Sequence, residues 1–441
     1  MHMYDILNRK RLGKALSQEE IEYFVQGCTT GEIPDYQLSA LLMAICIQGM
    51  NEEETAWLTM AMAHSGQMAD LSHIPGIKAD KHSTGGVGDK VTLVAAPLAA
   101  ACGVTVAKMS GRGLGYTGGT IDKLESIPGF TTQLPPETFA DIAGTVGVCI
   151  VSQSGELAPA DKKLYALRDV TATVESLPLI ASSIMSKKLA GGSDCIVLDV
   201  KTGGGAFMKT LEDSRALARA MVSIGTRAGK PTAALITDMN RPLGLTVGNA
   251  LEVEEACRVL CGEGSEDVRQ LSVEVAAAMV WLAGKAPDLA AARALAEEKL
   301  RDGSARERME EMIRRQGGDP EVVAHPERLP QGRVARQVLA SCSGWLGKVD
   351  TQGVGRCSVL LGAGREEKDS PLDYGAGIRF AKTLGSCVKK GEVLATVYAE
   401  TEQIAEEGAC ALQNAMEIAA FPPQIPPLFY DWITEKGEKE W

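Results

Sequence analysis

The sequence predicts an α/β protein with a small all-α domain, a large mixed, mostly parallel sheet flanked by helices, and a C-terminal α+β subdomain. Through the middle of the chain, short apolar strand-like runs alternate with longer helical segments, which is the pattern of a parallel sheet. The first 66 residues show helical periodicity only, and short Gly- and Val-rich strands follow Pro326–Gln331. A chain of 441 residues is long enough for two or three domains.

Helices with short connections are expected throughout the first 66 residues. A Ser or Asn followed three residues later by Glu forms a capping box, in which each side chain bonds the other residue's backbone N–H. A single Asp can also cap a helix start, and Gly commonly follows a helix end. The residues expected to begin or end these helices are Ser17 with Glu20, Asp35, Asn51 with Glu54, and Gly66.

The middle of the chain is expected to form the parallel sheet. Apolar runs predict buried strands at 104–109, 148–151, 195–200 and 233–237, with helices at 91–102, 137–146 and 211–229. In such a sheet, ligands bind at the carboxyl ends of the strands. Residues 161–190 interrupt this pattern with a helical segment that is expected to return to the N-terminal helices. The charged amphipathic helices of 264–316 are expected to be scaffold.

These changes of pattern predict the domain boundaries. The small α domain comprises residues 1–66 and a return segment, 161–193. The α/β domain comprises residues 67–160 and 194–335, and the C-terminal α+β domain comprises 336–441. No internal repeat or low-complexity tract interrupts this order.

Composition limits the classes of partner. A net charge of −12 argues against nucleic acid and acidic membranes, because both need a broad basic surface. No apolar run approaches the roughly 20 residues that span a bilayer, and the N-terminus does not resemble a signal peptide. Eleven cysteines without CxxC pairs indicate reduced thiols rather than a zinc site. We expect a cytoplasmic protein that binds small molecules.

The densest chemical signal is the segment 80–89, with the sequence Asp-Lys-His-Ser-Thr-Gly-Gly-Val-Gly-Asp, which precedes the helix beginning near Val91. Three glycines allow several backbone N–H groups to point at one place, and the helix N-terminus adds roughly half a positive charge. Lys81, Ser83 and Thr92 can add donors. A tight turn without a ligand is the alternative, but Lys, His, Ser and Thr beside the glycines favour a phosphate site.

A second glycine-rich segment, 108–120, follows another predicted strand. It carries the hydroxyl groups of Ser110, Thr117 and Thr120. Because both segments follow strands of one sheet, they are expected to converge on one anion. Neither segment ends in the Gly-Lys-Ser/Thr of a Walker A loop, and the fingerprint of a dinucleotide site is missing.

A third set of polar residues lies in the helical return segment. If 179–190 is helical, Ser183 and Lys187 lie one turn apart on the same face. Arg168 offers a planar fork of N–H donors, and Lys187 offers a point charge. Taken alone, either cation is more often a surface charge. Together they could bond the adjacent carbonyl and N–H edges of a planar ring.

With these residues the sequence resembles the pyrimidine-nucleoside phosphorylases, relatives of the thymidine phosphorylases. The matching stretches are 81–89, 110–130, 159–173, 182–188 and 199–203, and the resemblance runs nearly end to end. It implies a pentosyltransferase that uses inorganic phosphate to split uridine, thymidine or deoxyuridine into free base and pentose 1-phosphate. It also implies a homodimer whose small α domain and α/β domain close over a cleft.

The resemblance assigns roles to individual residues. Its implied phosphate ligands are Lys81, Ser83, Thr92, Lys108, Ser110 and Thr120. Its implied substrate-binding residues are Arg168, Ser183, Lys187 and Tyr116, and its implied catalytic residues are His82, Arg168 and Lys187. Donors aimed at the charge that develops on the departing base usually supply the largest catalytic effect. With a pKa near working pH, His82 is expected to donate a proton or a strong hydrogen bond to a base carbonyl.

A structural potassium ion is also implied. Its implied surroundings are Gly88, Lys90, Leu243, Thr246 and Glu255. Lys90 and Thr246 stand where the family has smaller residues, and Tyr116 stands where it usually has His. Backbone carbonyls could still hold the ion, whereas an inward-pointing Lys90 ammonium would repel it.

Three alternatives stay open at this point. A thymidine phosphorylase restricted to deoxynucleosides would differ in the packing around the sugar 2′ position. An anthranilate-type phosphoribosyltransferase would share the anion loop, but it needs magnesium-binding acidic residues, and no adjacent acidic pair stands out beside the loops. A biotinyl or lipoyl carrier is faintly suggested by 388–397, which has no Met-Lys-Met or Asp-Lys-Ala attachment sequence.

Overall fold

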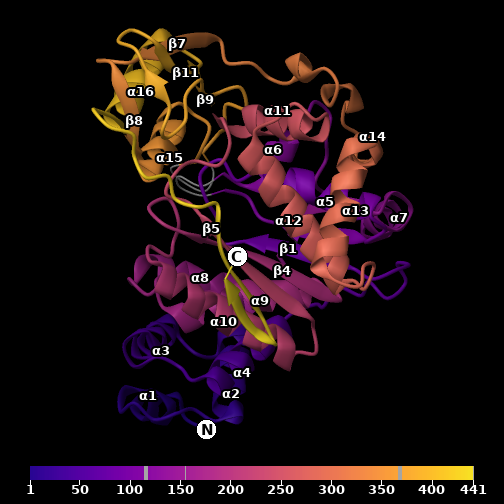
Figure 1. The fold of residues 1–441 in the computed structure, drawn as a ribbon. Helices are drawn as coiled ribbons and strands as arrows, with labels where there is room; N and C mark the ends of the chain where they lie inside the picture. Colours follow the sequence, from indigo (N-terminus) through magenta and orange to yellow (C-terminus); the bar gives the residue numbers. More distant parts are fainter. Residues whose placement is uncertain (114–117, 154, 366–369, 441) are drawn as a thin grey trace.

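A computed structural model describes residues 1–113, 118–153, 155–365 and 370–440 of the chain. The N-terminal helices lie at one end, a layer of parallel strands lies in the middle, and the C-terminal strands and helices lie beyond the sheet (Figure 1). The last residues return to the middle layer. The fold class predicted from the sequence is confirmed.

Four helices form the N-terminal unit, and two later helices pack against it. They are α1 (Met3–Arg11), α2 (Gln18–Thr30), α3 (Asp35–Gln48), α4 (Glu52–Ala63), α8 (Pro159–Val170) and α9 (Leu177–Ala190). Phe24, Leu38, Leu164 and Leu179 belong to one buried apolar cluster, so the two late helices share a core with the early ones. Helix α9 also packs against α10 (Leu211–Arg227).

The two predicted capping boxes are confirmed, at Ser17 with Glu20 and at Asn51 with Glu54. Two other predictions of helix ends are wrong. Pro34 is the cap of α3 and makes no side-chain bond, so Asp35 is the first helical residue instead. Helix α4 ends at Ala63 before Gly66. Gly66 serves close packing, since a Cβ there would lie 2.1 Å from the Glu156 carbonyl oxygen.

The central sheet has the order β1-β4-β5-β13-β14, and its first three strands are parallel. These strands are β1 (Ala79–Ser83), β4 (Cys195–Thr202), β5 (Thr232–Asp238), β13 (Phe429–Thr434) and β14 (Gly437–Glu440). A parallel pair, β2 (Val106–Ser110) and β3 (Val148–Ser152), lies beside β1 through a bridge between Lys78 and Thr105. The parallel strands therefore end at one edge of the sheet.

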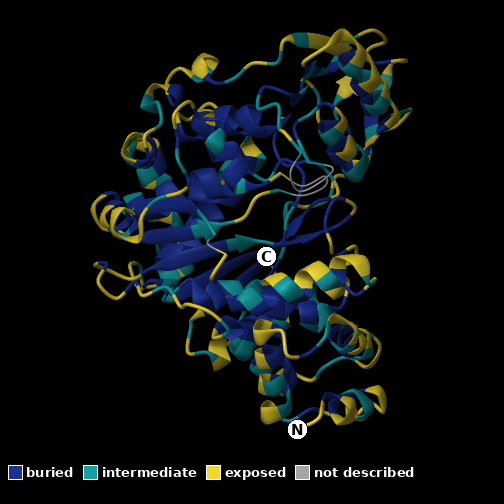
Figure 2. Cartoon of the chain, turned by 180° about the vertical axis from the view of Figure 1, so that it is seen from behind, coloured by how far each residue is buried: buried dark blue, intermediate teal, exposed yellow. Residues whose placement is uncertain are grey.

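Helices cover both faces of these strands. Helix α10 packs on β4 and β5, while α5 (Val91–Ala101) and α12 (Glu266–Leu282) pack together on the other side (Figure 1). The remaining helices of this region are α6 (Thr120–Glu125), α7 (Pro136–Val146), α11 (Asn249–Leu260), α13 (Leu289–Arg301) and α14 (Ser304–Arg315). Buried residues concentrate on the sheet and on the helices that flank it (Figure 2). In the described part of the chain, no helix is both long and apolar enough to cross a membrane.

The C-terminal unit contains two antiparallel sheets, with the orders β6-β9-β11-β7 and β10-β8-β12. Its elements are β7 (Val334–Leu339), β8 (Gly344–Val349), α15 (Thr351–Leu360), β9 (Gly377–Phe380), β10 (Cys387–Val388), β11 (Val393–Ala399), α16 (Glu402–Asn414) and β12 (Met416–Ala419). Strand β6 (Thr246–Val247) comes from the preceding region and pairs with β9.

The end of the predicted C-terminal domain, 336–441, does not stay with that unit. Strand β13 pairs antiparallel with β5 of the central sheet, and β14 pairs with β13. The physical reason is apolar burial, because Trp432 and Ile433 are buried in clusters formed by the central sheet and its helices. Strand β6, from the region before the C-terminal unit, pairs in turn with β9 of that unit. Strand pairing therefore joins the C-terminal unit to the central one at two places.

The outer edge of β3 is paired by a side chain instead of another strand. The Gln316 amide accepts a bond from the Ile150 N–H at 3.2 Å and donates to the Ile150 carbonyl at 2.9 Å. It also donates to the Thr131 carbonyl, and it is fully buried. A planar amide can satisfy a strand edge in this way because it carries both a donor and an acceptor.

We therefore expect Gln316→Leu to lower the free energy of unfolding by about 2–4 kcal/mol, since the variant leaves the Ile150 backbone groups buried without partners. Urea unfolding at equilibrium measures the change. Gln270→Leu is the matched control, because Gln270 is exposed and bonds only Glu266 among the described residues. Equal stability of the two variants would contradict this role for Gln316.

Candidate active site

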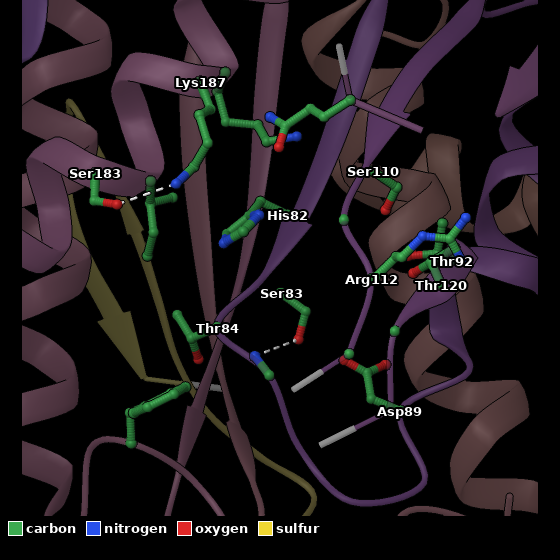
Figure 3. Close-up of a pocket in the computed structure, with 18 of the residues that line it drawn as sticks. His82, Ser83, Thr84, Asp89, Thr92, Ser110, Arg112, Thr120, Ser183 and Lys187 are labelled. Carbon is green, nitrogen blue, oxygen red and sulfur yellow. Dashed lines mark hydrogen bonds between the residues drawn. The ribbon is translucent and has the colours of Figure 1, made fainter. Parts of the chain in front are cut away.

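A cavity of about 390 Å³ lies at the carboxyl ends of β1 and β2, facing α8 and α9. Every described residue that the sequence analysis assigned to phosphate or nucleoside lines it. These residues are Lys81, His82, Ser83, Thr92, Lys108, Ser110, Thr120, Arg168, Ser183 and Lys187. Tyr116 lies outside the described residues. Ser183 and Lys187 stand on one side of His82, and Ser110, Thr92 and Thr120 stand on the other (Figure 3).

The first glycine-rich segment runs from the end of β1 into α5. Gly85 and Gly88 have φ angles of +93° and +77°, which side-chain-bearing residues rarely adopt. The Ser83 hydroxyl accepts a bond from the Gly85 N–H at 3.3 Å (Figure 3). Thr92 lies in the first turn of α5. The loop thus brings a hydroxyl, backbone N–H groups and a helix N-terminus to one wall of the cavity.

The second glycine-rich segment follows β2 and lies beside the first. Ser110 is the last residue of β2, and Thr120 is the first residue of α6. Asp122 accepts bonds from the Gly113 N–H and from Arg112, and these bonds hold the loop against α6. Two strand ends therefore place their hydroxyl groups around one space.

A buried carboxylate joins three elements beside the cavity, where its two lysine partners line the wall. Asp80 in β1 contacts Lys108 of β2 at 3.0 Å and Lys188 of α9 at 2.7 Å. Burial opposes ionisation, but the two lysines hold the pKa of Asp80 well below its ordinary value. Burial also lowers the pKa of Lys108 to about 8, with Asp80 opposing the shift. Two lysines on one carboxylate leave a net positive charge that an anion can balance.

Lys81 lies in a second group of charges. Its ammonium is 3.6 Å from Asp199 and 3.9 Å from Asp89. Lys201 also contacts Asp199, at 2.8 Å. Burial opposes the charge on Asp89, yet Lys81 and Lys201 hold the pKa of Asp89 well below its usual range. These ionic contacts fix the position of the Lys81 ammonium beside the glycine loop.

The environment of His82 differs from the sequence expectation. The pKa of His82 lies well below its ordinary value, because of burial first and then the nearby charges of Lys188 and Lys108. The expectation of a pKa near working pH is therefore wrong. At neutral pH the ring is uncharged, so it offers a neutral N–H donor rather than an imidazolium proton.

Arg168 and Lys187 line the same cavity but have different partners. Arg168 donates to the carbonyl oxygens of Thr173, Val174 and Leu179 at 3.2, 2.7 and 3.0 Å. These bonds use three of its five N–H donors and fix the plane of the guanidinium. The predicted pairing on one helix face is present, since the Lys187 ammonium donates to the Ser183 hydroxyl at 3.1 Å (Figure 3).

Lys187 also bonds Asp161 of α8 at 2.6 Å. Because the Lys187 side chain is 28% exposed, its ammonium can still reach a ligand in the cavity. Burial lowers the pKa of Arg168, which stays far above neutral pH in any protein. The α8–α9 side of the cavity therefore presents two fixed cations.

The implied potassium site does not fit the residues present. The Lys90 side chain is fully buried, and its ammonium lies 2.8 Å from the carbonyl oxygens of Leu243 and Thr246 and 2.7 Å from Glu255. A potassium ion among these oxygens would meet an ammonium of the same charge. The inward-pointing ammonium takes the oxygens that would bind the ion.

Several residues in or beside the cavity were not assigned from the sequence. Asp80 and Lys188 stand next to assigned residues in the same motifs, so adjacency was a signal that could have identified them. Tyr165 lies under Arg168, with the guanidinium carbon 5.6 Å from the ring centre. Phe207 lines the cavity near Gly85 from the loop after β4, and no local pattern in the sequence predicts this.

Three family models match successive parts of the chain. Residues 4–66 match the helical bundle domain of a glycosyl transferase family, and residues 76–306 match the a/b domain of that family. Residues 345–419 match a pyrimidine nucleoside phosphorylase C-terminal domain. The anthranilate phosphoribosyltransferase of Thermus thermophilus has a similar fold, with a TM-score of 0.59, 22% identity, and coverage of 70% of this chain and 98% of that one.

Full-length relatives are much more similar. The chain is 54% identical to a pyrimidine-nucleoside phosphorylase of Geobacillus stearothermophilus over 434 residues, which cover 98% of this chain and all of that one. It is 53% identical to a pyrimidine-nucleoside phosphorylase of Staphylococcus haemolyticus over 435 residues, which cover 99% and 100%. Identity above one half along essentially the whole length shows that the chain belongs to the pyrimidine-nucleoside phosphorylase family.

Proposed function

We propose that this protein catalyses the reversible phosphorolysis of pyrimidine nucleosides to free base and pentose 1-phosphate. One observation carries the proposal: a single cavity has hydroxyl and ammonium donors from two strand-end loops on one side and fixed cations of two helices on the other. His82 lies between them (Figure 3). A nucleoside and an inorganic phosphate need this arrangement, because the anomeric carbon lies between the phosphate and the base. Both of these groups carry negative charge in the transition state.

Phosphate is assigned to the strand-end side. Its proposed ligands are Lys81, Ser83, Thr92, Lys108, Ser110 and Thr120. The excess positive charge around Asp80 and the helix N-terminus of α5 favour a dianion there. Hydrogen bonds from ionised donors are about twice as strong as neutral ones, so Lys81 and Lys108 are expected to contribute most of the affinity.

The base is assigned to the α8–α9 side, with Arg168, Ser183 and Lys187 as its ligands. Arg168 is already held by three backbone carbonyls, so its remaining donors are preorganised for the ring. Preorganised donors stabilise developing charge without reorganising during the reaction. Tyr116 is proposed beside the pentose or base on the resemblance alone.

The chemistry follows from this placement. A phosphate oxygen bonds the anomeric carbon as the bond from that carbon to the ring nitrogen breaks. The bonding electrons stay on the base, where they spread onto its carbonyl oxygens, and the base later takes a proton from water. Lys187 and Arg168 stabilise that charge, while the neutral His82 N–H donates a hydrogen bond to a base carbonyl.

Closure of the cleft, dimerisation and location are also part of the proposal. Closure of the α domain, 1–66 and 161–193, onto the α/β domain would exclude water that competes with phosphate.

A homodimer is supported by the exposed apolar side chains of Tyr4, Tyr36 and Ile47 on the adjacent helices α1 and α3. A cytoplasmic location is supported by the cysteines, which are free thiols.

The test is an assay of base release from uridine, deoxyuridine, thymidine and cytidine, with and without phosphate and in the absence of magnesium. We expect free uracil or thymine and pentose 1-phosphate only when phosphate is present. Release from deoxynucleosides alone would indicate a thymidine phosphorylase. No release from any nucleoside, but release of base from a nucleoside 5′-phosphate with magnesium and pyrophosphate, would replace the proposal with a phosphoribosyltransferase.

We expect His82→Ala to lower kcat by about 10²–10³-fold, because a donor to the developing charge is lost while the fold survives. His82→Gln should retain more activity, since its amide keeps an N–H donor. Because the pKa of His82 is well below its ordinary value, the ring is uncharged at neutral pH and above. It becomes protonated only as the pH falls through that lowered pKa. Near-normal turnover of His82→Ala would remove the residue from the mechanism.

The affinity for phosphate should fall in alkaline solution. Since the pKa of Lys108 is about 8, its ammonium loses its proton as pH rises through that value, when phosphate is already a dianion. The KM for phosphate, measured at saturating nucleoside from about pH 7 to about pH 9.5, should rise on the alkaline side. Lys108→Met should show a high KM at every pH without that inflection. An unchanged inflection in this variant would assign it to another group.

A further inference from the structure

A buried ammonium lies where three segments of the chain meet, away from the reacting groups. Lys90 follows the glycine loop and directly precedes α5. Its ammonium contacts the carbonyl oxygens of Leu243 and Thr246 and the carboxylate of Glu255 in α11. The two chain segments other than its own are thus the one from Leu243 to Thr246, which ends at the start of β6, and helix α11.

The donors and acceptors balance at this place. An ammonium has three N–H donors, and three oxygens accept them at 2.7–2.8 Å. The Thr246 hydroxyl, 3.4 Å from the ammonium, donates to Glu255 at 2.6 Å and so keeps its lone pairs toward the cation. The other carboxylate oxygen accepts from the Leu245 N–H and the Ser265 hydroxyl. Every strong acceptor therefore has a donor.

The charges balance as well. The side chains of Lys90 and Glu255 are 0% and 5% exposed, so each needs an opposite charge close by. One ammonium neutralises one carboxylate here. A second cation would share the same carboxylate at short range, where repulsion in a weakly polar interior is strong.

Backbone geometry shows that this cluster is built closely around the ammonium. A Cβ on Gly88 would lie 2.6 Å from the Leu243 carbonyl oxygen, and a Cβ on Gly244 would lie 2.5 Å from Glu255. Both glycines have positive φ, at +77° and +74°. The backbone at these two glycines thus lies too close to the Leu243 carbonyl oxygen and to Glu255 for any side chain. The Lys90 side chain fills the space among the oxygens.

We propose that the Lys90 ammonium is the resident cation of this cluster, replacing a bound potassium ion with a covalently attached charge. It joins the phosphate-side glycine loop to α11 and to the segment that continues into β6, which pairs with the C-terminal strand β9. Lys90 is a positioning residue: it anchors Gly88 and Asp89 from behind and touches no substrate. This protein therefore needs no monovalent metal ion for its stability.

The first test measures the thermal midpoint of the intact wild-type protein in potassium chloride and in choline chloride at equal ionic strength. Choline is too large to enter the cluster. If the cluster bound potassium, the thermal midpoint would be higher in potassium chloride and would level off as the potassium concentration rises. We expect the same midpoint in both salts. Crystals soaked in thallium(I), a strongly scattering substitute for potassium, should show no anomalous peak among Leu243, Thr246 and Glu255.

The second test converts the cluster into a metal site. Lys90→Ser should lower the midpoint by roughly 5–10 °C in choline chloride, because a buried carboxylate loses its partner. Potassium should restore much of this loss in a saturating manner, since the vacated space is lined by carbonyl and carboxylate oxygens. Lys90→Met, which fills the space without a charge, should be destabilised equally in both salts.

The matched control is Lys382→Ser. Lys382 contacts Glu392 at 2.6 Å, but both side chains are partly exposed, so its removal should change the midpoint little and without dependence on potassium. A saturating rise of the wild-type midpoint with potassium, or a thallium peak at the cluster, would overturn the proposal. So would wild-type stability of Lys90→Ser in choline chloride. None of these measurements uses catalysis, so failure of the proposed function would leave them interpretable.

Discussion

The geometry of the site depends on one buried carboxylate, Asp80. It lies in β1 and bonds Lys108 of β2 and Lys188 of α9, so a single side chain joins two strands to a helix beside the cavity. A buried charge must be paired, and this requirement fixes the three elements relative to each other. The strand-end loops and the cationic helix are held at opposite sides of one space for this reason.

The same cluster sets the electrostatics of the cavity. Burial first, and then the excess positive charge of the two ammonium groups that share Asp80, keep His82 neutral. A neutral imidazole suits the proposed reaction, in which the site binds phosphate and releases an anionic base, because lysine and arginine already supply the fixed charges. His82 then contributes a directional hydrogen bond rather than a charge. In the proposed reaction, lysine and arginine supply the charges and His82 supplies one uncharged donor.

A second buried ion pair, Lys90 with Glu255, supports the glycine loop that follows β1. It connects that loop to β6 and through β6 to the C-terminal sheet. The C-terminal unit is also joined to the centre by β13, which extends the central sheet beside β5. Contacts with residues distant in the sequence therefore hold the glycine loop in place. They explain how a glycine-rich segment keeps a defined conformation.

Local sequence determined the elements and the chemical identity of the site. Apolar runs predicted β2 to β5, the capping boxes at Ser17 and Asn51 marked helix starts, and glycines beside Lys81 and Ser83 indicated an anion loop, because these features depend on neighbouring residues. Tertiary structure decided what depends on distant ones. The pKa of His82 follows from lysines of β2 and α9, the direction of Lys90 follows from oxygens more than 150 residues away, and β13 joins the central sheet through burial of Trp432. Long-range burial and charge pairing leave no periodic trace in the sequence, so these features became visible only in the folded chain.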